Sequence, residues 1–208
     1  MARPIIGPTA PDTPAGARIK GAAIREVVRW YTRAHGRAAL AEAARQMPPE
    51  ILRQLDPNDD ALGIIASTWY DVAVVHAMLD AIVAPYPPAE RHVLIRTAAR
   101  EAVRTSMNGV YKFVVAQIVT PSFYARNIQR LWRMLHDGGK REIEIVREGH
   151  AVSRTWDWPG HHPLLCETTI ETMCAIFELT GRKDVVARRT QCVSHGASEC
   201  VAEVRWNA

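Results

Sequence analysis

Three cysteines near the C-terminus are the residues of this chain best suited to chemistry. Cys192 and Cys200 lie eight positions apart with Gly196 midway between them, and Cys166 lies 26 residues before Cys192. A central glycine suits a β-hairpin whose turn brings the two outer thiols together. Thiols gathered in this way bind a metal, pair as a disulfide or fill a core as small buried groups. The spacing leaves these three interpretations open. The fourth cysteine, Cys174, lies in an apolar helical stretch and is expected in the core.

Aromatic side chains on or beside expected helices are the candidates for a ligand-binding cavity. A small-molecule pocket needs apolar walls and a few polar groups that orient the ligand. The candidates are Trp69, Tyr70, Phe123, Tyr124 and Trp132. The alternative is that these residues form ordinary core.

Histidines offer a weaker signal. His161 and His162 stand together on an expected loop near Trp156 and Trp158, where they could line a pocket or hold a metal, although adjacent residues rarely point the same way. A solvated loop is the alternative. His76 lies in an apolar helical stretch, as a haem ligand would. A hydrogen-bonded core histidine explains it equally.

Catalytic motifs are missing from the sequence. It contains no Walker loop, no G-x-G-x-x-G, no H-E-x-x-H and no G-x-S-x-G. No spacing of acids and histidines selects a general acid–base pair. The sequence therefore favours a protein that is not an enzyme.

Composition indicates an ordinary globular chain. The 208 residues are 48% hydrophobic, and 26 basic against 22 acidic residues give a net charge of +4. Sparse cysteines, the lack of a signal peptide and the lack of an apolar run of about 20 residues predict a cytoplasmic protein without a membrane span. Aromatic residues do not interleave with the arginines as they do in nucleic-acid grooves, so no nucleic-acid partner is expected. We therefore expect the clustered basic residues on a solvated surface: Arg126, Arg130, Arg133, Lys140, Arg141, Arg182, Lys183, Arg188 and Arg189.

The elements that would position these side chains follow from periodicity. Residues 1–18 hold four prolines and predict a flexible tail before a single domain over 19–208. Ile24, Val27, Val28 and Tyr31 form the apolar stripe of a first helix. Further helices are expected over 38–46, 50–55, 69–83, 89–107 and 120–136. Residues 111–118 are compatible with a helix or a strand.

The C-terminal part changes to strand patterns. Residues 142–147 and 151–156 alternate around a turn and predict a hairpin, and 185–193 with 200–206 predict a second one. A helix over 163–179 separates them. The sequence thus predicts an α+β fold in which a helical N-terminal half packs on an antiparallel sheet built from two hairpins, in the order β-β-α-β-β.

A family resemblance rests on this C-terminal region. The stretch from Trp156 through Gly181 to the cysteine hairpin and Trp206 resembles the end of a 4-vinyl-reductase-like domain. That superfamily is related to haem-NO-binding sensor domains and to TRAPP-like trafficking subunits. The chain from about Ile19 also resembles an uncharacterised paralogous family of myxobacteria.

The resemblance implies a metal site as well as a fold. In related phenol-responsive activators, three cysteines and a glutamate hold a structural zinc, and Cys166, Cys192 and Cys200 match the three cysteines. The glutamate position is Arg189 here, and an arginine cannot ligate zinc. This departure favours a metal-free cluster; His195, Glu167 or Cys174 would have to replace the missing ligand. The tyrosine–serine–arginine signature of haem-NO sensors is not found, which argues against haem.

We therefore expect a non-enzymatic sensor domain that binds a small apolar ligand, forms a homodimer and signals through a partner protein. A ligand-free dimeric interaction module is the alternative. A third hypothesis, which the superfamily name alone suggests, is an enzyme acting on a tetrapyrrole. A cavity lined by Trp69, Phe123 or Trp132 would favour the first hypothesis, and a filled interior with an exposed apolar patch would favour the second.

Overall fold

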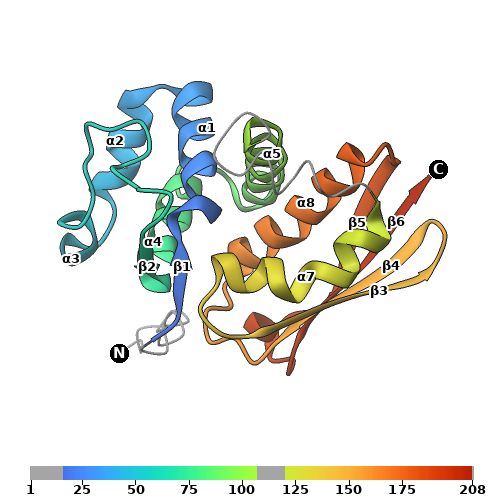
Figure 1. Cartoon of the computed structure of the whole chain (residues 1–208). Coiled ribbons are helices and arrows are strands. Elements are labelled where there is room, and N and C mark those ends of the chain that lie inside the picture. The colour runs from blue at the N-terminus through green and yellow to red at the C-terminus, as the bar shows by residue number, and fades with distance from the viewer. Residues whose placement is uncertain (1–15, 107–119, 208) are drawn as a thin grey trace, which may run out of the picture.

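The computed structural model describes residues 16–106 and 120–207. A helical half forms the N-terminal part, and two later helices lie over a four-stranded antiparallel sheet (Figure 1). The predicted α+β class and the sheet built from two hairpins are confirmed.

The helical half begins with a short strand and ends with the long helix α5. Its elements are β1 (Arg18–Lys20), a 3-10 turn η1 (Gly21–Ala23), α1 (Arg25–His35), α2 (Arg37–Arg45), α3 (Pro49–Leu52), β2 (Trp69–Asp71), α4 (Val72–Val83) and α5 (Pro88–Ser106). The stripe Ile24, Val27, Val28 and Tyr31 is buried as predicted. Burial of this stripe against neighbouring helices, more than helix propensity, stabilises a helix of this length.

The start of α4 corrects one expectation. The sequence predicts a helix from Trp69, but Trp69 and Tyr70 lie in β2, which pairs antiparallel with β1. The helix begins at Val72, where the Asp71 carboxylate accepts the backbone N–H of Ala73 at 2.8 Å and caps the first turn. Pairing with β1 therefore overrides the helical pattern in these three residues.

The tail and the 111–118 segment fall largely outside the described residues. Residues 1–15 of the predicted tail are not among the described residues. Ala17 is buried and Arg18 opens β1, so the fold begins before residue 19. Helix α5 is described up to Ser106, and the expected helix end at residue 107 lies outside the described residues.

Helix α7 (Pro121–Leu135) begins where the sequence predicts. The Thr120 hydroxyl accepts the backbone N–H of Phe123 at 3.0 Å, and Pro121 occupies the first helical position. Proline needs no hydrogen-bond acceptor there, and its fixed φ suits the first turn.

The sheet has the strand order β3-β4-β6-β5, and every neighbouring pair is antiparallel. Its strands are β3 (Lys140–Arg147), β4 (His150–Trp156), β5 (Lys183–Gln191) and β6 (Cys200–Asn207), with α8 (Pro163–Leu179) between the two hairpins. The connection between β5 and β6 contains a 3-10 turn, η2 (Val193–His195), and then Gly196 at a φ of 89°, a left-handed conformation that favours glycine.

Helices α7 and α8 cover one face of this sheet (Figure 1). Ile143 of β3 and Trp206 of β6 are buried there against Tyr124 and Ile128 of α7 and Phe177 of α8. The ring of Phe177 meets the ring of Trp206 edge-on at 5.1 Å. The sheet and these two helices thus share one core.

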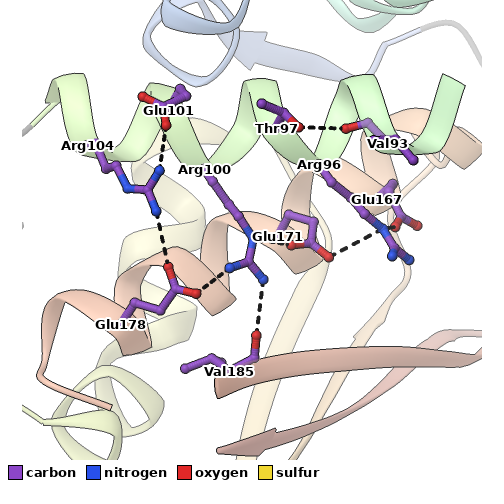
Figure 2. A network of polar contacts seen from close by, with 10 residues as sticks. All are labelled: Val93, Arg96, Thr97, Arg100, Glu101, Arg104, Glu167, Glu171, Glu178 and Val185. Atoms are coloured by element: carbon purple, nitrogen blue, oxygen red, sulfur yellow. Dashed lines mark hydrogen bonds and ion pairs between the residues drawn. The ribbon is translucent and has the colours of Figure 1, made fainter. Parts of the chain in front are cut away.

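An ion-pair network joins α5 of the helical half to α8 (Figure 2). Arg96 donates to Glu167 at 2.6 Å and Arg100 donates to Glu171 at 2.7 Å, although both glutamates are buried on α8. Arg100 also pairs with Glu178 and donates to the carbonyl of Val185 in β5 at 3.1 Å. The network fixes α5 against the layer that covers the sheet.

Among the described residues, no single helix is both long and apolar enough to cross a membrane. Helices α4 and α5 satisfy that test by length and composition only as a pair, which is bent by 118°.

Candidate functional site

A cavity of about 180 Å³ lies where the helical half meets α7 and α8. Its described walls come from η1, the start of α1, α5, α7, α8 and the first residues of β3. The apolar lining includes Ala102, Val103, Ile128, Leu131, Leu165 and Ile176. Apolar walls with few polar groups are typical of small-molecule sites.

Trp132 and His136 are two of the residues that line this cavity. Their rings stack with centroids 3.5 Å apart and planes only 2° from parallel, and Trp158 meets both rings edge-on at 5.1 Å. The indole N–H of Trp132 donates to the carbonyl of Gly138 at 2.9 Å. Both rings are therefore held in place before any ligand binds.

His136 presents a neutral imidazole to the cavity. Its Nδ1 lies 3.2 Å from the carbonyl oxygen of Trp132, and because a carbonyl only accepts, Nδ1 carries the proton. Burial lowers the pKa of His136 to about 3, and the nearby Arg141 cation contributes to the lowering. Nε2 is therefore a hydrogen-bond acceptor, and the structure gives it no partner among the described residues.

Arg141 is the cation that lines this cavity. The sequence places Arg141 on a solvated surface, and the structure shows that this expectation is wrong. It is 6% exposed, because alternation along β3 places it on the same inward face as Ile143. Its guanidinium lies over the ring of Trp132 at 5.6 Å. Burial lowers its pKa, yet an arginine stays protonated in proteins.

The five aromatic candidates separate into two groups. Tyr124 and Trp132 line the cavity. The described walls do not include Trp69, Tyr70 or Phe123. The ring of Trp69 lies beneath the cations of Arg18 and Lys20. The Tyr70 hydroxyl accepts the backbone N–H of Ile65 at 2.9 Å. Phe123 is one residue from Tyr124 on α7, so its side chain points about 100° away around the helix.

The three cysteines of the hairpin and α8 form a compact cluster. The Sγ atom of Cys200 lies 3.5 Å from that of Cys166 and 3.6 Å from that of Cys192, and all three residues are buried. The geometric expectation that these sulfurs lie together agrees with the structure. Cys174 packs elsewhere, in the core between α8 and the sheet.

His161 is the fourth donor of the cysteine cluster. Its Nδ1 lies 3.2 Å from the Cys200 sulfur and 3.6 Å from the Cys166 sulfur, and burial lowers its pKa, which keeps the ring neutral. The sequence offers His161 only as half of a pair with His162. Instead His162 stacks on His76 with centroids 4.6 Å apart, and His76 Nε2 bonds the carbonyl of Gly160 at 3.1 Å.

The replacement ligands considered from the sequence lie elsewhere. The carboxylate of Glu167 is held by Arg96 and by Arg189, at 3.5 Å from the latter. His195 lies on η2 and does not belong to the group of described donor atoms that lie close enough together to hold a metal ion. The loop residue His161, five positions before Cys166, belongs to this group instead.

Arg189 lies beside the cluster rather than in it. Its guanidinium donates to the carbonyl of Pro163 at 3.1 Å and toward the sulfur of Cys192 at 3.7 Å. Contacts with the Cys166 and Cys200 thiols lower the pKa of Cys192, whereas contacts with Cys192 and Cys200 raise the pKa of Cys166. Arg189 therefore places a cation beside the most acidic thiol of the group.

A haem, which the haem-NO-binding resemblance implies, does not fit the described cavity. The cavity is smaller than the roughly 300–1,000 Å³ of sites for drug-sized ligands, and a haem is no smaller than those ligands. The ring of His136 stacks on Trp132 and its Nδ1 bonds a backbone carbonyl, so the ring is already held in place. A haem carries two propionates, but Arg141 is the one arginine or lysine of the described walls. His76 is not among the described lining residues.

Comparison with known proteins finds likeness in structure alone. No protein-family model matches the sequence, and no curated protein matches it. An H-NOX protein from S. oneidensis, solved in the Fe(II)NO ligation state, superimposes with a TM-score of 0.65 at 11% identity, covering 91% of this chain and 100% of its own. An unliganded Fe(II) H-NOX protein from K. algicida gives 0.66 at 11% identity, with coverages of 91% and 97%. A mutant H-NOX protein from T. tengcongensis gives 0.62 at 8% identity, with coverages of 91% and 98%. The chain therefore has a fold like that of the haem-NO-binding domains.

Proposed function

We propose that this chain is a sensor domain that binds a small, largely apolar ligand in the cavity beside Trp132 and signals through a partner protein. The cavity itself is the observation that carries the proposal. Its volume of about 180 Å³ is close to that of an apolar protein cavity of about 150 Å³ that binds benzene. A ligand the size of one aromatic ring therefore suits it.

The position of the cavity supports a sensing role. Ala22, Ala23 and Ala102 contribute walls from the helical half, while Ile128 and Ile176 contribute walls from the two helices over the sheet. A ligand in contact with both halves stabilises the conformation that it binds best over other arrangements of the two halves. A partner protein that binds one of these conformations would then respond to the ligand. A filled interior would have favoured the interaction-module alternative.

A cavity-filling variant tests the proposal. Ala102→Leu adds three carbon atoms at the α5 wall and should abolish binding of toluene or benzoate without harming the fold. A ligand at 100 times its Kd stabilises the native state by about 2.7 kcal/mol, or about 5–10 °C in Tm for a chain of this size. The wild type should show this shift and Ala102→Leu should not.

Ala89→Leu is the matched control. It places the same side chain at an exposed position on the first turn of the same helix, α5. It should respond to the probes as the wild type does. If Ala102→Leu retains the wild-type shift, the ligand does not bind in this cavity.

We also propose that Cys166, Cys192, Cys200 and His161 hold a structural zinc ion. A tetrahedral site with Zn–S bonds of about 2.3 Å places its sulfurs about 3.8 Å apart, close to the 3.5 and 3.6 Å found here. Cys192 is the outer member, because the donors that all lie within 4.8 Å of one another are those of His161, Cys166 and Cys200. Arg189 offsets the net negative charge that three thiolates and Zn²⁺ would carry.

Native mass spectrometry of protein purified without added metal tests the zinc proposal. We expect one zinc per chain in the wild type and in Cys174→Ser, which changes a buried cysteine outside the cluster. Cys192→Ser should lose the ion and several kcal/mol of stability, because binding energy is folding energy at such a site. Equal metal content in the two variants would contradict the assignment.

A further inference from the structure

Arg141 is buried without a counter-charge. Its guanidinium has five N–H donors. Among the described residues, one of these contacts the carbonyl of Thr169 at 3.4 Å, Nε is buried without any partner, and no carboxylate lies within ion-pair distance. Removing a charge from water costs several kcal/mol unless a partner compensates it. A fold that keeps such a cation against an apolar cavity indicates an anion that arrives from outside.

Neither nearby source of negative charge serves Arg141. Glu26 lines the cavity, and its Oε1 pairs with Arg29 at 3.4 Å and with Arg25 at 3.7 Å, while its Oε2 is buried without a partner among the described residues; Glu26 makes no ion pair with Arg141. The cysteine cluster borders a separate void of about 20 Å³ that Arg141, Cys166 and Cys200 line, but no cysteine sulfur of the described residues lies within hydrogen-bond distance of the Arg141 guanidinium, and Arg189 is the cation that contacts the cluster. Among the described walls, Arg141 is therefore a cation that no carboxylate neutralises by direct contact.

The remaining polar groups define what kind of anion fits. The hydroxyls of Thr168 and Thr169 donate to backbone carbonyls of α8, each at 2.9 Å. Arg141 is the one arginine or lysine of the described walls, and it has no carboxylate partner there, which suits a single negative charge. The planar guanidinium fork matches a carboxylate through two parallel N–H···O bonds. The apolar lining and the small volume require the rest of the ligand to be a compact hydrocarbon.

We infer that the cavity binds a small monocarboxylate with a compact apolar body, of the size of benzoate, whose carboxylate pairs with Arg141. The inference rests on the proposed ligand-sensing function and specifies its ligand class. A neutral ring such as a phenol would fill the same volume but leave Arg141 uncompensated.

Calorimetric titration of the full chain with benzoate, benzamide and toluene tests this inference. These probes share one ring and differ in charge. A charge-assisted hydrogen bond contributes about 1.5–3 kcal/mol, so benzoate should bind about tenfold or more tightly than benzamide. Arg141→Gln should remove that preference and leave benzamide binding within about threefold of the wild type. Arg133→Gln, the same substitution on the exposed face of α7, should change neither affinity.

The outcomes separate the two proposals. If benzamide or toluene binds the wild type as well as benzoate does, the charge inference fails while the ligand cavity stands. If none of the three probes binds the wild type, both fail. The benzoate-to-benzamide ratio of the wild type decides the inference even where Arg141→Gln does not fold.

Discussion

Glu171→Gln should destabilise the chain by about 2 kcal/mol by weakening the attachment of α5 to α8. Glu171 is 3% exposed, and its carboxylate accepts from Arg100 at 2.7 Å and lies 3.6 Å from Arg96 (Figure 2). Removing one partner of a fully buried pair costs about 3–5 kcal/mol, because the other charge is left uncompensated.

The cost here should be lower for two structural reasons. The side chain of Arg96 is 51% exposed and that of Arg100 is 24% exposed, so water reaches both cations. Each also keeps another carboxylate, Glu167 for Arg96 and Glu178 for Arg100. About 2 kcal/mol corresponds to a fall in Tm of about 4–8 °C for a chain of this size.

Urea unfolding and thermal melts of the purified chain measure the effect. Glu101→Gln is the matched control, because Glu101 lies on α5 in an exposed pair with Arg104 and should cost no more than about 0.5 kcal/mol. At about 1 M salt the difference between the two variants should persist, since screening affects buried pairs less. Equal destabilisation by the two substitutions would refute the reasoning.

Three further predictions follow from the site and the fold. Burial lowers the pKa of His136 to about 3 in the folded chain, against 6.5 for the free side chain, so the unfolded state binds the proton first as pH falls and His136 should cost about 4 kcal/mol of stability between pH 6.5 and 3. His136→Gln should remove this part of the fall in a urea-midpoint profile and leave the part that His76, with its pKa lowered to about 4, contributes; a profile identical to that of the wild type would contradict the assignment. Trp132→Ala should reduce the ligand-induced rise in Tm, whereas Arg133→Ala on the exposed face of α7 should not; equal responses would remove Trp132 from the binding site. The predicted two-fold homodimer should scatter light at twice the 23.2 kDa chain mass, and a monomer mass at high concentration would contradict it.

The sequence by itself determined most of the secondary structure and the grouping of the cysteines. Helix α8 spans Pro163–Leu179 as its periodicity predicts, because a proline start, an apolar face and a following glycine act locally. Cys192 and Cys200 meet for a similar reason, since a hairpin turn fixes the pairing of its own strands. Such signals depend on neighbours in the chain and can be read from it.

Tertiary structure alone decided the site. His161 joins Cys166 and Cys200 because the loop before α8 folds over the β5–β6 connection, and no spacing in the sequence encodes that approach. Trp69 is in a strand because β1 pairs with it from about 50 residues away. The alternation of Arg141 with Ile143 along β3 does predict that Arg141 faces inward. Whether an inward-facing arginine contacts a carboxylate or an apolar cavity depends on which side chains of α5, α7 and α8 pack around it, and the sequence does not show that.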